Sequence, residues 1–306
     1  EHQRRPADLV LVSPAPYVGL GAATRFSVEQ HVPLALDYRD AWSLDVIHGT
    51  EAFPRDCDAG RWESDAVGRA SSVWFVNDPI RRFYQDRYPE RADRMSTVPN
   101  GFDGDPGALV HAGAHSPLRF GYLGTITLDV EQITDLLRGW RLARAASPRL
   151  ADATLEFRGH IATSNVGAGR RQRAIERFAA DGVSFGGPVR REEVAALYGE
   201  WDALVLALVG GEYVTSGKVY EYAATGLPIV SAHAPESAAA AVLASYPRWF
   251  PNRSDAFCVR GILPLRWKPF RSAFRRLILA AIPLLRRAGP ARFWWRRERM
   301  PSPWLR

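Results

Sequence analysis

Short apolar runs alternate with longer amphipathic segments along the first third of the chain. Runs of this kind are typical of strands buried in a sheet, and the segments between them are typical of helices. The predicted strands cover residues 8–13, 33–37, 73–76 and 96–98, and the predicted helices cover 19–30, 58–70 and 79–87. Strands that alternate with helices imply parallel βαβ units with right-handed crossovers.

A second alternating series follows a stretch rich in Gly, Pro and His. Its predicted strands are 118–122, 154–158, 183–185, 203–207 and 228–230, and its predicted helices are 129–144, 167–180, 191–200, 217–225 and 236–245. We therefore predict an α/β chain with a partial Rossmann-like domain at 1–104, a linker at 105–117, a Rossmann-like domain at 118–250 and a tail at 251–306. The first domain is expected to be incomplete, because only about a hundred residues precede the linker, at the lower end of the ~100–150 of a Rossmann-like half, and only one predicted strand precedes the strand that ends at Asp37.

One stretch of the second domain has the residue types of a phosphate-binding helix start. Thr215 and Ser216 are residues that often cap helices, Gly217 lets backbone approach a ligand closely, and Lys218 adds a cation. Glu221 lies four residues after Gly217, about 6 Å further along the helix at ~1.5 Å per residue. This is roughly the distance from a nucleotide's phosphates to its ribose hydroxyls, which a carboxylate can bind. The alternative is a solvated helix face, on which a Lys and a Glu three residues apart are common.

These residues, with their neighbours, resemble a known family. The run from Lys218 to Ala223 followed by Gly226-Leu227-Pro228 is similar to the nucleotide-sugar site of family-4 type retaining glycosyltransferases. Three further segments resemble that family in the same order along the chain: 37–42, 98–103 and 120–125. The resemblance implies the GT-B fold, in which two Rossmann-like domains face each other across a cleft, and it suggests that the family's first strand region is missing here.

The family's chemistry implies a division of roles among the matching residues. A sugar would pass from a nucleotide-sugar donor to an acceptor hydroxyl with retention, without a divalent metal or a cofactor, while positive charge stabilises the leaving diphosphate. The expected donor-binding residues are Gly124, Thr125, Arg158, Thr215, Ser216, Gly217, Lys218 and Glu221. Two phosphate-binding cations that the family often places just after Gly124 are absent, so Lys218 is the chief cation of the predicted site.

Two acidic residues complete the predicted catalytic set with Lys218. The family has a glutamate eight residues before the ribose-binding one; that position is Tyr213 here, so Glu212 either takes the role with a loop shift or is a solvent-facing acid. Asp40 and its neighbour Arg39 follow a predicted strand, where they can bind the acceptor or form an ion pair within the loop. The acceptor itself is a lipid, a polysaccharide or a small metabolite; the sequence does not choose among them.

Charge separates the tail from the rest of the chain. Residues 252–306 contain 14 Lys or Arg against two acids and so carry a net charge of +12. Because the whole chain carries +7, residues 1–251 carry −5. The tail, with Trp294 and Trp295 among arginines, is either a basic amphipathic segment for an anionic membrane, or a poorly folded end or the product of a shifted reading frame. Cys57 and Cys258 have no metal-ligand spacing, which favours a reducing, cytoplasmic location, with peripheral membrane contact through the tail.

Other function classes fit the sequence less well. Gly19-Leu20-Gly21 with Asp37 imitates a dinucleotide fingerprint, but five residues separate the strand from the glycines and Thr24 replaces the third glycine. The Asp-x-Asp pairs at Asp56 and Asp103 are interpreted as turn residues, so no metal site is predicted. Nucleic-acid binding is disfavoured by the acidic body. An inactive remnant that at most binds nucleotide remains the main alternative to an active transferase.

Overall fold

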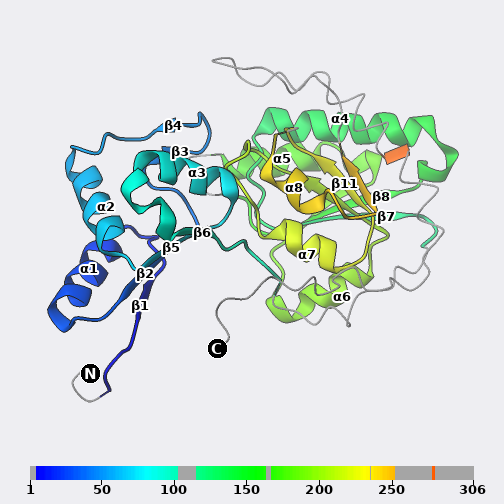
Figure 1. The fold of residues 1–306 in the computed structure, drawn as a ribbon. Coiled ribbons are helices and arrows are strands. Elements are labelled where there is room, and N and C mark those ends of the chain that lie inside the picture. Colours follow the sequence, from blue (N-terminus) through cyan, green and yellow to red (C-terminus); the bar gives the residue numbers. More distant parts are fainter. Residues whose placement is uncertain (1–4, 103–114, 163–166, 235, 252–277, 280–306) are drawn as a thin grey trace. The chain divides into compact units, whose positions relative to one another are not determined.

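The structure is a computed structural model that describes residues 5–102, 115–162, 167–234, 236–251 and 278–279. It divides into two compact units, which are described here one at a time (Figure 1). Unit 1 consists of residues 1–101, 210–215 and 236–239, and unit 2 consists of the remainder. The membrane and tail predictions for 252–277 and 280–306 lie outside the described residues.

Unit 1 is built on a parallel sheet of four strands in the order β1-β2-β5-β6. The strands are β1 (Val10–Val12), β2 (Leu34–Tyr38), β5 (Ser72–Phe75) and β6 (Met95–Thr97). The helices between them are α1 (Val18–Gln30), α2 (Asp58–Arg69) and α3 (Asp78–Arg87). A two-stranded hairpin, β3 (Leu44–Asp45) with β4 (Thr50–Glu51), occupies the loop after β2, where the sequence pattern predicted no strand.

The three helices of unit 1 pack against one face of this sheet. Strands that follow one another along the chain are also neighbours in this sheet. The right-handed crossovers between them therefore all run in one direction and place every helix on the same face. Leu36 and Phe75 from the sheet, with Leu20, Val67 and Tyr84 from the helices, belong to one buried core. Leu11 points to the opposite face and is 55% exposed.

A buried carboxylate ties the helices of unit 1 together. Glu63 of α2 is fully buried and accepts hydrogen bonds from the hydroxyls of Tyr84 (2.7 Å) and Tyr88 (2.9 Å). The Tyr84 hydroxyl also accepts from the backbone amides of Trp42 (3.1 Å) and Ser43 (3.3 Å), which follow β2. Because a buried charge is tolerated only when it is hydrogen-bonded, this network holds the loop after β2 in place.

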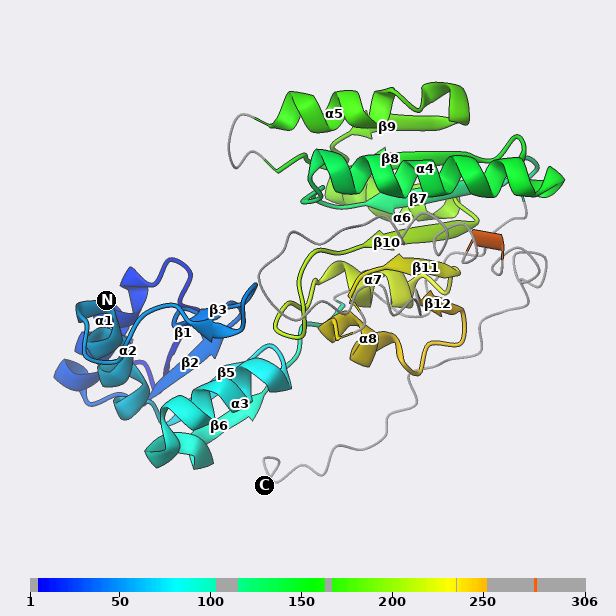
Figure 2. The same cartoon turned by 90° about the horizontal axis from the view of Figure 1, so that it is seen from above.

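Unit 2 has a parallel sheet of six strands in the order β12-β11-β10-β7-β8-β9, as Figure 2 shows. The strands are β7 (Arg119–Leu123), β8 (Thr154–Arg158), β9 (Val183–Gly187), β10 (Ala203–Ala207), β11 (Ile229–Ala232) and β12 (Trp249–Pro251). Its helices are α4 (Val130–Ala146), α5 (Ala168–Glu176), α6 (Val194–Gly199) and α7 (Lys218–Ala224); α8 (Ala238–Leu243) begins in the 236–239 segment of unit 1.

Helices cover both faces of the sheet in unit 2. Trp140 of α4 and Ile175 of α5 pack with Phe120 and Phe157 in one core. On the other face, Trp201, which follows α6, lies where a side chain at Gly121 of β7 would stand. Figure 1 accordingly shows α4 above the sheet and α6 and α7 below it. This is a doubly wound α/β sheet.

The strand order of unit 2 reverses between β7 and β10. The chain runs outward from β7 through β8 to β9, then returns to β10 and runs the other way through β11 to β12. In open α/β sheets, ligands bind outside the carboxyl ends of the strands at such a switch point. The loops after β7 and β10 are therefore the place in unit 2 where a ligand is expected.

Most predicted elements are present with shifted ends. Every predicted strand and helix of the two series has a counterpart, and the α/β class is confirmed, with parallel sheets of four and six strands. The predicted helix 236–245 is shorter, and β12 pairs with β11 although no strand was predicted there. No helix within the described residues is long and apolar enough to cross a membrane.

Candidate functional site

Lys218 reaches from the first turn of α7 to the end of β7, at the switch point of unit 2. Its ammonium donates a hydrogen bond to the Tyr122 hydroxyl (2.7 Å) and approaches the carbonyl oxygen of Thr125 (3.5 Å). The same nitrogen lies 4.3 Å from the centroid of the Tyr122 ring, which is a cation–π contact. The Tyr122 hydroxyl in turn donates to the Thr125 carbonyl (3.0 Å), so the three residues form one small network.

Burial makes the charge of Lys218 sensitive to its surroundings. The pKa of Lys218 is lowered to about 8 by loss of solvation, an effect that the nearby carboxylate of Glu221 partly offsets. Lys218 and Lys268 are the chain's two lysines among 40 basic side chains. An arginine would stay charged at any such pH, whereas a lysine in this position can respond to an anion that binds beside it.

Two glycines let the ends of β7 and β8 come close together under Lys218. Gly124 and Gly159 both have φ of +124°, a conformation that favours glycine. A Cβ on Gly124 would lie 3.1 Å from Cε and 3.2 Å from Nζ of Lys218, and a Cβ on Gly159 would lie 2.3 Å from the Gly124 carbonyl oxygen. The backbone of Gly124 therefore packs closely between the Lys218 side chain and the backbone of Gly159.

Tyr222 fixes α7 to the same loop, and the sequence analysis did not single it out. Its buried hydroxyl accepts from the Leu123 amide (2.7 Å) and donates to the Leu123 carbonyl (3.0 Å). Tyr222 lies four residues after Lys218, hence on the same side of the helix. The four-residue spacing from Lys218 could have identified Tyr222 from the sequence. No such spacing links Tyr122 to the site, because it lies 96 residues before Lys218.

Glu221 lies on the exposed side of α7, one turn beyond the start of the helix. Its carboxylate acts electrostatically on two neighbours within unit 2: it raises the pKa of Lys218 and, after burial, contributes to the raised pKa of Tyr198. An exposed carboxylate one helical turn from an ammonium has the arrangement expected for a group that grips ribose hydroxyls beside a diphosphate.

The expected helix cap differs in the structure. Gly217, not Thr215 or Ser216, is the N-cap of α7, and no side chain caps the helix. The hydroxyl of Thr215 instead accepts a hydrogen bond from Asn77 Nδ2 (3.1 Å), within unit 1. Asn77 Nδ2 also donates to the Tyr213 carbonyl (3.0 Å). The amides of Ser216 and Gly217 meet no acceptor within the described part of the chain.

Arg158 takes a different direction from the one predicted. Its guanidinium pairs with Glu156 on its own strand (3.2 Å) and lies against Gly186 of β9, where an added Cβ would come within 2.7 Å. Its backbone carbonyl, however, accepts from the Gly124 amide (3.0 Å). The structure thus brings together Gly124, Thr125 and Lys218, while Arg158 contributes to this loop through its main chain.

The predicted acceptor-side residues lie in unit 1. Arg39 pairs with Asp37 (Nε to Oδ1, 2.8 Å) rather than with Asp40, because Asp37 lies two positions before it on the same side of the strand end. Asp40 is exposed. Burial raises the pKa of the Tyr17 hydroxyl to about 12, and the negative charge of Asp40 contributes to this rise. Tyr17 stacks on Trp42 with ring centroids 4.8 Å apart. These groups form an aromatic and acidic surface after β1 and β2.

Glu212 is exposed within the 210–215 segment that belongs to unit 1. Burial, followed by the Glu212 carboxylate, raises the pKa of the neighbouring Tyr213 hydroxyl. The ring of Tyr213 lies against Gly49, where an added Cβ would be 3.1 Å away.

Two alternative sites can be compared with the described residues, although Asp103 and Asp105 lie outside them. Gly19 and Gly21 lie inside α1 rather than in a loop before it, so they do not build a dinucleotide fingerprint, and Asp37 is engaged by Arg39. Among the described residues, no group of three or more His, Cys, Asp or Glu side chains is arranged to hold a metal ion.

Comparison with known protein families finds a match that lies mostly in unit 2. Residues 118–250 match the family model described as Glycosyl transferases group 1. No curated protein sequence matches this chain. The matched residues contain the switch point, Gly124, Lys218 and Glu221.

Solved structures with similar folds cover nearly all of this chain. HepE from Anabaena, in complex with UDP and glucose, is 15% identical over 92% of this chain and 70% of its own, with a TM-score of 0.58. Sucrose-phosphate synthase from Thermosynechococcus elongatus is 16% identical over 94% and 68%, with a TM-score of 0.56. The pneumococcal O-GlcNAc transferase GtfA, in complex with UDP and GlcNAc, is 13% identical over 91% and 50%, with a TM-score of 0.56. The chain thus spans between half and seven-tenths of these proteins, and at such identities the likeness establishes the fold.

The fold and the family therefore agree. The chain has the GT-B fold of these solved structures, and its residues 118–250 match the family model of the group 1 glycosyltransferases.

Proposed function

We propose that this chain transfers a sugar from a nucleoside-diphosphate sugar to an acceptor hydroxyl with retention and without a divalent metal. The observation that carries the proposal is the position of Lys218, whose ammonium is held against Gly124 at the switch point of the matched domain, one turn before Glu221. The solved structures of similar fold that contain UDP favour a UDP-sugar as the donor.

In this proposal Lys218 binds the diphosphate together with backbone groups. The amides of Ser216, Gly217 and Thr125 supply neutral donors, Gly124 allows the close approach of the loop, and Thr215 and Arg158 position these segments through the hydrogen bonds described above. Glu221 accepts hydrogen bonds from the two ribose hydroxyls. Charge-assisted bonds of this kind are among the stronger hydrogen bonds in proteins.

Lys218 also has the catalytic role that such a reaction needs. When the bond from the sugar to the diphosphate breaks, negative charge grows on the leaving phosphate oxygen. An ammonium already held in place by Tyr122 and shielded from water stabilises that charge without having to reorganise. The acceptor hydroxyl then attacks on the face that the diphosphate leaves, and its proton passes to the leaving phosphate.

Asp40 is proposed for the acceptor, and Glu212 is proposed for the transferred sugar. Asp40 is exposed beside the stacked pair Tyr17 and Trp42, a surface on which a sugar or another amphipathic acceptor can lie. Glu212 is an exposed carboxylate that can accept a hydrogen bond from the transferred sugar. The acceptor class, whether lipid, polysaccharide or small metabolite, is left to experiment.

The first test is a calorimetric titration of UDP, with GDP and ADP in parallel, into the intact chain. Glu221→Ala is expected to weaken the preferred nucleotide by at least about tenfold, because it removes hydrogen bonds to a charged group worth about 1.5 kcal/mol or more. Glu131→Ala, which removes an exposed glutamate in the first turn of α4, is the matched control and is expected to bind as wild type. Failure of all three nucleotides to bind would refute the proposal.

The second test distinguishes an active transferase from a remnant that only binds nucleotide. UDP-sugars are incubated with the chain and a panel of glycoside, lipid and polysaccharide acceptors in the presence of a chelator, and release of UDP is measured. Acceptor-dependent release that survives chelation and is lost in Lys218→Met supports the proposal. Nucleotide binding without acceptor-dependent release supports the remnant.

A further inference from the structure

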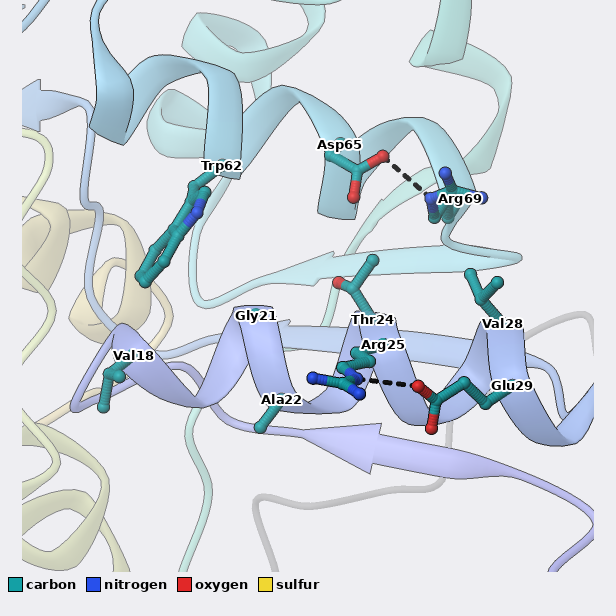
Figure 3. Close-up of a pocket in the computed structure, with 10 residues that line it drawn as sticks. All are labelled: Val18, Gly21, Ala22, Thr24, Arg25, Val28, Glu29, Trp62, Asp65 and Arg69. Carbon is teal, nitrogen blue, oxygen red and sulfur yellow. Dashed lines mark hydrogen bonds and ion pairs between the residues drawn. The ribbon is translucent and has the colours of Figure 1, made fainter.

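A hollow that lies entirely within unit 1 is far from Lys218 in sequence. It is a cavity of about 680 Å³ between α1 and α2, open to solvent and shown in Figure 3. Its volume falls in the range of small-molecule sites, about 300–1,000 Å³. None of its lining residues takes part in the glycosyl-transfer proposal.

An exposed indole forms one wall of this cavity. Trp62 of α2 is 54% exposed, and Figure 3 shows its ring extending from α2 toward Gly21 of α1. A Cβ on Gly21 would lie 3.9 Å from the ring, so the glycine leaves the indole room to lie close to the α1 backbone. Val18 and Val28 of α1 are 65% and 44% exposed and add apolar surface along the same helix. A flat aromatic wall with aliphatic neighbours suits a ligand with a flat apolar face.

The polar groups of the cavity come as two ion pairs with no net charge. Arg25 Nε lies 2.7 Å from Glu29 Oε1 on α1, and Arg69 Nε lies 2.8 Å from Asp65 Oδ1 on α2. Each guanidinium keeps further N–H donors and each carboxylate keeps a second oxygen as an acceptor. A charged ligand of either sign would lie beside two side chains of its own sign as well as two of the opposite sign, so the site favours neither anions nor cations. Hydroxyl groups, which both donate and accept, fit this alternation best.

A buried hydroxyl in the lining lacks the hydrogen bond that it needs. Thr24 is 5% exposed, and its Oγ1 has no partner among the described residues. Figure 3 shows Thr24 rising from α1 toward α2, between the indole and the two ion pairs. A buried hydroxyl without a partner is unfavourable, and a ligand hydroxyl that reaches this depth would supply the missing hydrogen bond.

We propose that the cavity between α1 and α2 is a carbohydrate-binding site for a neutral pyranose. The apolar face of the sugar ring stacks on Trp62, its hydroxyls bridge the free donors and acceptors of the two ion pairs, and one hydroxyl pairs with Thr24. This site belongs to unit 1 alone and is independent of the nucleotide site at Lys218, so either can exist without the other.

The test is a titration of the intact chain with methyl α-D-glucopyranoside, methyl α-D-mannopyranoside and maltotriose, followed by saturation-transfer NMR and calorimetry. At least one of these probes is expected to bind with a millimolar Kd. Trp62→Ala is expected to weaken that binding by at least about tenfold, and Thr24→Val, which keeps the side-chain shape, by about threefold to tenfold. D-Glucuronate is expected to bind more weakly than the neutral glucoside.

Controls separate loss of the site from loss of the fold. Ile47→Ala truncates an exposed apolar side chain of unit 1 outside the cavity and is expected to leave sugar binding unchanged. Each variant is also titrated with UDP, whose affinity is expected to stay at the wild-type value. The proposal is overturned if none of the three sugars binds, if Trp62→Ala binds them as wild type does, or if the Trp62 variant instead changes only self-association or protein binding.

Discussion

The ammonium of Lys218 lies 2.7 Å from the hydroxyl of Tyr122 and 4.3 Å from the centre of its ring. The two residues come from opposite sides of the switch point, one at the start of α7 and the other near the end of β7. Tyr122 is fully buried, and burial raises the pKa of its hydroxyl, so it stays neutral and can accept from the ammonium while donating to Thr125. This contact holds an ammonium, whose charge can change with pH, at the switch point where folds of this class bind ligands.

Nucleotide affinity is expected to depend on pH through Lys218. Burial lowers the pKa of this ammonium in the free protein to about 8, and a bound diphosphate raises it again. Above pH 8 the free protein carries a neutral Lys218, so binding must take up a proton. The affinity for UDP is therefore expected to fall as pH rises from 7 to 9, approaching tenfold per unit above pH 8.

Lys218→Met is the decisive variant for this prediction. Calorimetric titrations at pH 7, 8 and 9 are expected to show weak binding with little pH dependence in the variant. Arg138→Met, which removes a cation on α4, is expected to retain both the affinity and the pH dependence of wild type. A pH profile that Lys218→Met leaves unchanged would show that another group titrates.

The glycine at the end of β8 is expected to be intolerant of substitution for steric reasons. Gly159→Ala puts a Cβ 2.3 Å from the Gly124 carbonyl oxygen in a backbone with φ of +124°. The loop beneath Lys218 must then shift, at an expected cost of at least about 3 kcal/mol in the free energy of opening β7 and β8, and UDP binding is lost with it. Hydrogen exchange of the β7 and β8 amides measures the opening.

Gly187→Ala provides the comparison. Gly187 also has a positive φ, +70°, but an added Cβ would meet nothing within 4 Å. Only the conformational cost of about 1–2 kcal/mol is expected, with UDP affinity retained. Equal costs for the two variants would contradict the close approach of the two loops.

Two neighbouring tyrosines in unit 1 are expected to respond differently to loss of their hydroxyls. Tyr84→Phe removes a donor to the buried Glu63 and an acceptor for the amides of Trp42 and Ser43, so it is expected to cost about 2 to 3 kcal/mol. The Tyr38 hydroxyl is buried without a partner among the described residues, and its ring packs 5.1 Å from that of Tyr84. Tyr38→Phe is expected to be neutral within about 0.5 kcal/mol or slightly stabilising.

Hydrogen exchange at the β2 amides reports the opening of unit 1 directly, which avoids assuming that a chain of two units unfolds in one step. A loss of stability in Tyr38→Phe comparable to that in Tyr84→Phe would contradict the hydrogen-bond network around Glu63.

The alternation of apolar runs and amphipathic segments was sufficient to predict the elements because it is a local property. A buried strand of a parallel sheet must be apolar on both faces, and α1 and α4 need apolar positions only on the side that packs. Element ends were less well determined. The N-cap residue of α7 is Gly217, and the Thr215 hydroxyl bonds to Asn77, a residue 138 positions away.

The sequence by itself determined the α/β class, the two series of strands and helices and the spacing of Lys218 and Glu221, because each depends on residues within a few turns of one another. Tertiary structure alone decided that Tyr122 contacts Lys218, that Tyr222 joins α7 to Leu123 and that residues 210–215 belong to unit 1. The hydroxyls of Tyr122 and Tyr222 bond to groups nearly a hundred residues away, and such contacts arise from the packing of whole elements, which no local pattern encodes.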